Sequence, residues 1–79
     1  MTPFTVDCPI EVAYIEATAK AIVSRLPDTC QMPESALAST LVFFTKGELV
    51  DESTGVVIRW RELGGTNPYM RITAEIPKK

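Results

Sequence analysis

The sequence predicts an α+β fold in which an N-terminal helix packs on a three-stranded antiparallel sheet. Apolar residues recur every three or four positions over residues 9–26, which is typical of an amphipathic helix. Runs of equal length follow at 43–50, 56–63 and 69–76, separated by short loops rich in Gly, Ser, Asp and Asn. That pattern is typical of a β-meander. We expect one domain over residues 1–79, because a chain of this length forms at most one core.

The opening residues are expected to form a short extra edge strand or an extended arm. Residues 2–7 alternate in polarity, with Phe4 and Val6 on one side. Pro3 favours the edge of a sheet, where a missing N–H costs no ladder hydrogen bond.

The helix is predicted from about Pro9 to Leu26. Pro9 suits the first turn of a helix, and Asp7 or Cys8 would then be the N-cap. Pro27 ends the helix. The apolar side chains that form its predicted core stripe are Val12, Ile15, Ala19, Ile22, Val23 and Leu26.

The segment over residues 34–46 is open to two interpretations. Residues 34–40 have helical propensity, and Leu37, Leu41 and Phe44 would form one helical stripe. The β-branched and aromatic residues of 41–45 instead favour a strand. We prefer a strand over 43–50, with Gly47 as a β-bulge. The alternative is two helices followed by a β-hairpin.

The last two strands are predicted over 56–63 and 69–76, with hairpin loops at 51–55 and 64–68. Side chains alternate between the two faces of a strand. One face of these two strands is apolar and is expected to face the helix. It consists of Val56, Ile58 and Trp60 of the first strand and Met70, Ile72, Ala74 and Ile76 of the second. The other face becomes our candidate binding surface, formed by Val57, Arg59, Arg61, Tyr69 and Arg71.

This arginine-bearing, partly apolar face predicts a small stand-alone protein-binding module, such as an inhibitor, an adaptor or an assembly subunit. Arginine forks bind carboxylates and phosphates, and Tyr69 can fill a pocket of a partner. A plain solvated face, with Glu62 and Glu75 neutralising the arginines across strands, is the simpler reading. A nucleic-acid-binding module is a further alternative, which the net charge of −2 disfavours.

A homodimer is the self-association that the sequence predicts. As a strand, Leu41–Phe44 has apolar side chains on both faces, and one helix covers only one face. A second copy would then cover the open sheet face, unless residues 29–39 fold back over it.

Cys8 suggests a different function. It is expected at the start of the helix, where the helix dipole favours a thiolate. Cys8-Pro9 resembles the Cys-Pro-x-Pro motif of small sulfur-carrier proteins of the sulfurtransferase-accessory type, although Glu11 replaces the second proline. The resemblance implies a thiol or sulfur carrier. Asp7 opposes thiolate formation, so we expect Cys8 to be an ordinary thiol, and the predicted helix separates it from Cys30 too far for a disulfide.

Catalysis is not expected. The chain has no histidine, so it lacks the usual base for a serine or cysteine nucleophile. Two cysteines alone do not complete a zinc site, and no glycine loop with a lysine is present to bind phosphate. We therefore expect a protein that is not an enzyme, with no metal and no cofactor. The apolar runs are too short to predict a membrane span. We expect no signal sequence and we expect both thiols to be reduced, which together predict a cytoplasmic location.

Overall fold

The computed structural model describes residues 2–27, 30 and 32–77. Within them it forms two helices and a four-stranded antiparallel sheet, which confirms the α+β class. The elements in chain order are β1 (Thr2–Pro9), α1 (Val12–Ser24), α2 (Glu34–Phe43), β2 (Lys46–Asp51), β3 (Val56–Leu63) and β4 (Tyr69–Ile76).

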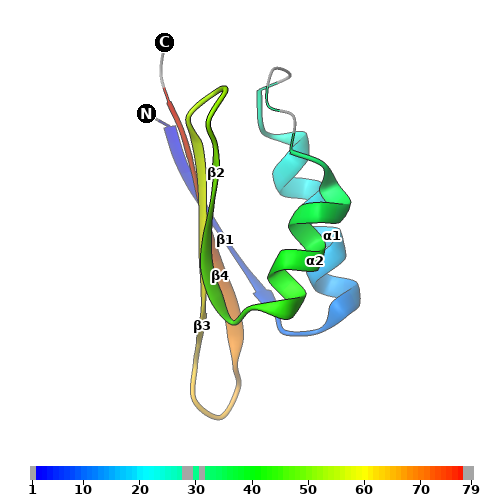
Figure 1. The fold of residues 1–79 in the computed structure, drawn as a ribbon. Helices are drawn as coiled ribbons and strands as arrows, with labels where there is room; N and C mark the ends of the chain where they lie inside the picture. The colour runs from blue at the N-terminus through cyan, green and yellow to red at the C-terminus, as the bar shows by residue number, and fades with distance from the viewer. Residues whose placement is uncertain (1, 28–29, 31, 78–79) are drawn as a thin grey trace.

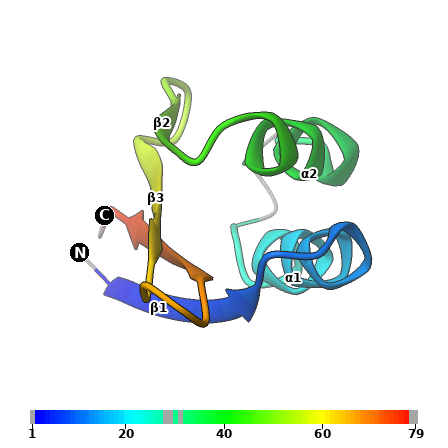
Figure 2. The ribbon, with the colours of Figure 1, turned by 90° about the horizontal axis from the view of Figure 1, so that it is seen from below.

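The sheet and the helices form two layers. The strand order is β1-β4-β3-β2, so β1 and β2 are the edges. Both helices pack on the same face of the sheet (Figures 1 and 2). The opposite face, which we call the outer sheet face, has no covering element among the described residues.

The expected edge strand at the N-terminus is confirmed, and it is longer than predicted. β1 pairs with β4 from Thr2↔Ile76 to Pro9↔Tyr69, and an edge strand tolerates its prolines. Because the strand continues to Pro9, α1 begins only at Val12, with Glu11 as the N-cap. The N-cap expected at Asp7 or Cys8 was therefore wrong.

The predicted stripe of α1 faces the core along most of its length. Ile15, Ala19 and Ile22 are buried, and Leu26 just beyond the helix is buried as well. Val12 is the exception and is exposed, because it begins the helix and lines a surface groove described below.

The segment 34–43 is a helix, so the strand expected over 43–50 starts three residues too early. Leu37 and Leu41, one helical turn apart, are fully buried. The chain then leaves α2 through Phe44 in an extended conformation, and the indole N–H of Trp60 donates to the Phe44 carbonyl at 3.0 Å. Burial of two leucines outweighs the local β-propensity of residues 41–45.

Gly47 is not a bulge. β2 pairs with β3 without interruption from Lys46↔Arg61 to Asp51↔Val56, which places Gly47 opposite Trp60. A Cβ atom at this position would lie 2.7 Å from the Trp60 ring. The glycine therefore provides the space in which the indole lies against β2.

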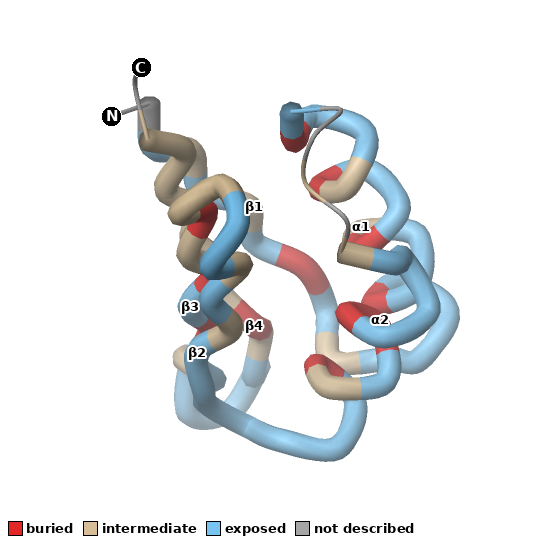
Figure 3. Tube along the Cα trace, turned by 45° about the horizontal axis from the view of Figure 1, so that its top comes forward, coloured by how far each residue is buried: buried red, intermediate tan, exposed pale blue. Residues whose placement is uncertain are grey.

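The two later strands and the loop 64–68 are confirmed at the predicted bounds, whereas the first loop begins one residue later than predicted, at 52, because Asp51 belongs to β2. Gly55 and Gly64 each have a φ of +80°, a conformation that favours glycine; Gly55 ends the turn before β3, and Gly64 begins the loop after β3. The buried residues lie between the sheet and the two helices (Figure 3). The largest fully buried side chains are Ile22, Leu37, Leu41, Val56, Ile58 and Ile72. None of the described helices is long and apolar enough to cross a membrane.

We expect Leu41→Ala to lower the free energy of unfolding by about 2–5 kcal/mol, because it leaves a cavity in the core. Phe43→Ala should change it by less than about 0.5 kcal/mol, because 79% of Phe43 is exposed. Urea denaturation measures both values. Equal losses in the two variants would contradict the helical assignment and favour a two-sided strand.

Gly47→Ala should destabilise the fold by about 1–3 kcal/mol, because the new methyl group overlaps the Trp60 ring. Gly65→Ala is the matched control, since a Cβ atom there meets nothing within 4 Å. Denaturation followed by Trp60 fluorescence measures the difference. If both variants were equally stable, the close packing of Trp60 on β2 would be disproved.

Candidate protein-binding surface

All five residues predicted for the binding surface lie on the outer sheet face. Their neighbours in the chain, Val56, Ile58 and Trp60, are buried against the helices. The pairing of β3 with β4 places their outward residues side by side at four levels, which are Val57↔Glu75, Arg59↔Thr73, Arg61↔Arg71 and Leu63↔Tyr69. The alternation of the sequence therefore predicted which side chains share this face.

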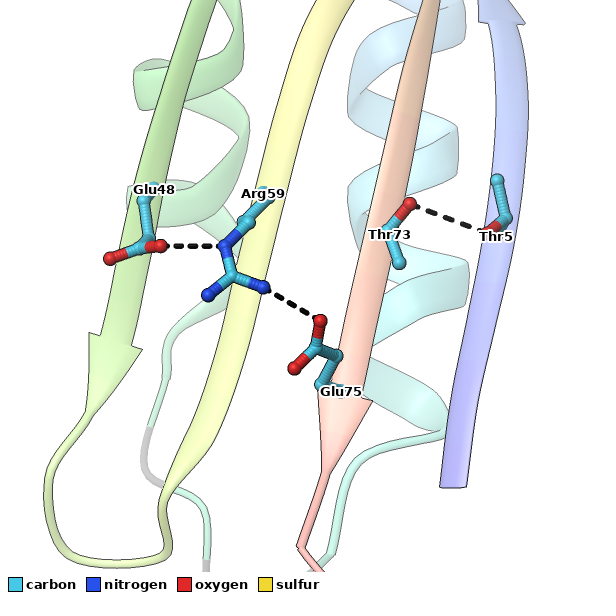
Figure 4. Close-up of polar contacts among 5 residues, drawn as sticks. All are labelled: Thr5, Glu48, Arg59, Thr73 and Glu75. Atoms are coloured by element: carbon cyan, nitrogen blue, oxygen red, sulfur yellow. Dashed lines mark hydrogen bonds and ion pairs between the residues drawn. The ribbon is translucent and has the colours of Figure 1, made fainter. Parts of the chain in front are cut away.

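Arg59 lies between two carboxylates. Its Nε donates to Glu48 at 2.7 Å and its Nη1 donates to Glu75 at 2.6 Å, as Figure 4 shows. The hydrogen bond that Arg59 donates to Glu48, followed by the negative charge of Glu75, raises the pKa of the Arg59 guanidinium. Glu75 was expected as a neutralising partner. Glu62 was also expected, but it pairs across the sheet with Met70 and belongs to the opposite face.

Arg71 binds Asp7 through two parallel hydrogen bonds. Its Nε and Nη2 donate to the two carboxylate oxygens at 2.9 and 3.1 Å. This hydrogen bonding lowers the pKa of the Asp7 carboxyl group. The guanidinium also lies 5.7 Å from the centre of the Tyr69 ring. The sequence did not identify Asp7 as a partner, because the pairing of β1 with β4 joins opposite ends of the chain.

Three cations lie in one row across the sheet, directly below the Arg59 level. Lys46 is opposite Arg61, and Arg61 is opposite Arg71. We call these three residues the basic row. Asp7 ends the row on β1, and within the described residues no ion pair joins Lys46 or Arg61 to a carboxylate. Arg61 and Arg71 also line a shallow hollow of about 430 Å³ on this face.

Apolar groups border the charged centre of the face at both ends. Leu63, Tyr69 and Pro9 lie side by side next to the basic row. At the other end Val50 lies opposite Val57, and Val50 is exposed. The outer sheet face therefore offers a central band of charges between two apolar edges.

A second surface lies between the two helices and was not anticipated from the sequence. Val12, Val42 and Phe43 line a groove of about 680 Å³, and Glu16 and Glu34 line it as well. The assignment of residues 41–44 to a strand concealed this groove, because helical spacing is what brings Val42 and Phe43 to one side of α2.

Neither cysteine has the setting that the carrier hypothesis needs. Cys8 lies inside β1 on the helix-facing side and is 5% exposed, so its expected place at a helix N-terminus was wrong. Cys30 is half-buried, and burial followed by a hydrogen bond with Asp51 raises the pKa of its thiol. Both are free thiols. The described residues hold no group of three or more metal-ligating side chains.

Comparisons with protein-family models, with curated proteins and with solved structures found no match for this chain.

Arg71→Gln should raise the pKa of the Asp7 carboxyl group toward its ordinary value, because the guanidinium that stabilises the carboxylate is lost. Since the folded-state pKa is lowered, the pair stabilises the fold above the ordinary aspartate pKa, and this contribution disappears as the pH falls through the folded value. An NMR titration of the carboxyl carbon between about pH 2 and 6 measures the shift. Arg59→Gln, which leaves Arg71 in place, should not move the Asp7 pKa. A shift of equal size in that control would rule out the direct pair.

Proposed function

We propose that this chain is a small protein-binding module, such as an inhibitor, an adaptor or an assembly subunit, that acts through the outer sheet face. One observation supports this above all. Both helices cover one face of the sheet, while the other combines arginines, a tyrosine and apolar side chains in a fixed register. Arginine and tyrosine are enriched at protein interfaces and often dominate their binding energy.

The geometry favours binding because two of the arginines are already ordered. Glu48 and Glu75 hold Arg59, and Asp7 holds Arg71. A long side chain that is ordered before binding loses less conformational entropy when the partner arrives. The face is therefore preorganised for a partner, even though exposed ion pairs of this kind add little to the stability of the free protein.

The alternatives have weaker support. A nucleic acid would bring its phosphates close to three carboxylates of the same face, Asp7, Glu48 and Glu75. A sulfur carrier needs an accessible thiol, and Cys8 is buried. The proposal includes a cytoplasmic site of action, where both thiols would stay reduced, and a binding role that needs no cofactor.

The observation that led us to expect a homodimer does not hold in the structure. The expectation rested on Leu41–Phe44 as a strand with two apolar faces, whereas Leu41 is buried in α2. Residues 34–39 form part of α2 on the helix side and do not fold over the outer sheet face, and residues 29 and 31 lie outside the described residues. Our proposal therefore assigns the outer sheet face to a different protein, and self-association is an outcome to be tested.

Site-specific photo-crosslinking tests the proposal. Benzoylphenylalanine replaces Tyr69 in one variant and Phe43 in a matched control on the helix surface. Irradiation of the source cells should yield one discrete crosslinked protein from position 69 and none from position 43. Crosslinks from position 43 alone would transfer the function to the helix groove. A product of twice 8.7 kDa would identify a homodimer instead, and a crosslink to nucleic acid would refute protein binding at this face.

A further inference from the structure

The basic row is an electrostatic imbalance that the fold itself does not need. Like charges directly opposite each other on neighbouring strands destabilise a sheet, and Arg61 has a cation opposite it on both sides. Arg59, two residues away on the same strand and face, instead has carboxylates on both sides. The same residue type on one strand thus occurs in two opposite electrostatic settings.

The carboxylates of this face are already committed elsewhere. Glu48 and Glu75 bind Arg59, and Asp7 binds Arg71. Glu62, next to Arg61 in the chain, belongs to the opposite face. The row therefore keeps two positive charges that no described carboxylate neutralises, within a chain whose net charge is −2.

We propose that the partner presents an acidic protein segment whose carboxylates bind the basic row; this inference rests on the proposed function of the outer sheet face. Neighbouring strands lie about 4.8 Å apart, so the row spans about 10 Å from Lys46 to Arg71. Alternate side chains of an extended segment are about 7 Å apart, which lets two carboxylates contact the three cations. Arg61, with a guanidinium that no described carboxylate occupies, is the central bidentate donor.

The apolar strip beside the row completes the recognition. Leu63, Tyr69 and Pro9 lie one level beyond the cations, where a large apolar side chain of the same segment would be buried. The expected segment therefore combines two carboxylates at alternate positions with one large apolar residue. A phosphate backbone, by contrast, has no apolar group for this strip and would repeat its charge toward Glu48 and Glu75.

Peptide titrations followed by NMR test the inference without the natural partner. The probe is capped hexaglutamate, with hexaglutamine and a six-nucleotide oligothymidylate as comparisons. Hexaglutamate should shift the side-chain signals of Lys46, Arg61 and Arg71, and Arg61→Gln should weaken its binding about tenfold, as expected for loss of a charge-assisted contact. Asp7→Asn should strengthen it about twofold to threefold, because it frees Arg71. Binding should weaken as salt is added.

The matched control removes an arginine that lies outside the outer sheet face, with the same change in net charge as Arg61→Gln. Arg25→Gln, at the C-cap of α1, should leave hexaglutamate binding within about twofold of the original, because a distant exposed charge is largely screened. Arg61→Gln should not lower the melting temperature, which separates a binding role from a structural one. Equal weakening by both variants, absence of hexaglutamate binding, or tighter binding of the oligothymidylate would each overturn the inference.

The two proposals fail in different ways. If position 69 crosslinks to a protein but Arg61→Gln does not alter hexaglutamate binding, the acidic segment is wrong and the binding face stands. If Arg61→Gln weakens hexaglutamate binding but position 69 crosslinks to no protein, the basic row is an anion site and the proposed function is wrong.

Discussion

The antiparallel register between β3 and β4 is the constraint on which the rest of the structure depends. Leu63 lies opposite Tyr69 across the loop 64–68, and this one pairing decides which side chains of both strands face the helices. A slip of one residue would turn one strand over relative to the other, so that a shift of β3 would turn Ile58 outward and bring Arg59 into the core, and burial therefore fixes the register strongly. The outer sheet face is a direct consequence, because every arginine on it alternates with a buried apolar residue.

Local sequence patterns were sufficient to predict β3, β4 and the hairpin that joins them. Equal runs separated by glycine-containing loops predicted the bounds of β3 and β4, and alternation predicted five residues that share the outer sheet face. The segment 34–46 was harder, because local β-propensity competed with a helix whose stability comes from burying Leu37 and Leu41. The sequence predicted β1 only in part, as a short edge strand or an extended arm. Its pairing with β4 depends on contacts between the two ends of the chain, and for that reason Asp7 was missed as the partner of Arg71.

Lys46, a residue of the proposed site, was missed because the start of β2 was predicted wrongly. The hairpin between β2 and β3 pairs Asp51 with Val56, and the same register leads back to Lys46 opposite Arg61. A bulge at Gly47 would have shifted this pairing and placed Lys46 on the other face. The uninterrupted pairing of β2 with β3 excludes the bulge, and Gly47 instead leaves room for the Trp60 ring, a tertiary contact that the sequence alone does not reveal. The basic row was therefore visible only after the tertiary contact was known.

The repulsion within the basic row lowers the stability of the fold only slightly, so the fold tolerates it. A bound anion would relieve it. A like-charged cross-strand pair costs about 0.2–1 kcal/mol, whereas a domain of this size is stable by about 0.05–0.15 kcal/mol per residue. Because the row is exposed, water screens much of the repulsion, and Asp7 offsets part of it at one end. An arriving carboxylate would remove the repulsion and form new charge-assisted hydrogen bonds in the same step. Arg59 contributes little to that change, since Glu48 and Glu75 already neutralise its charge.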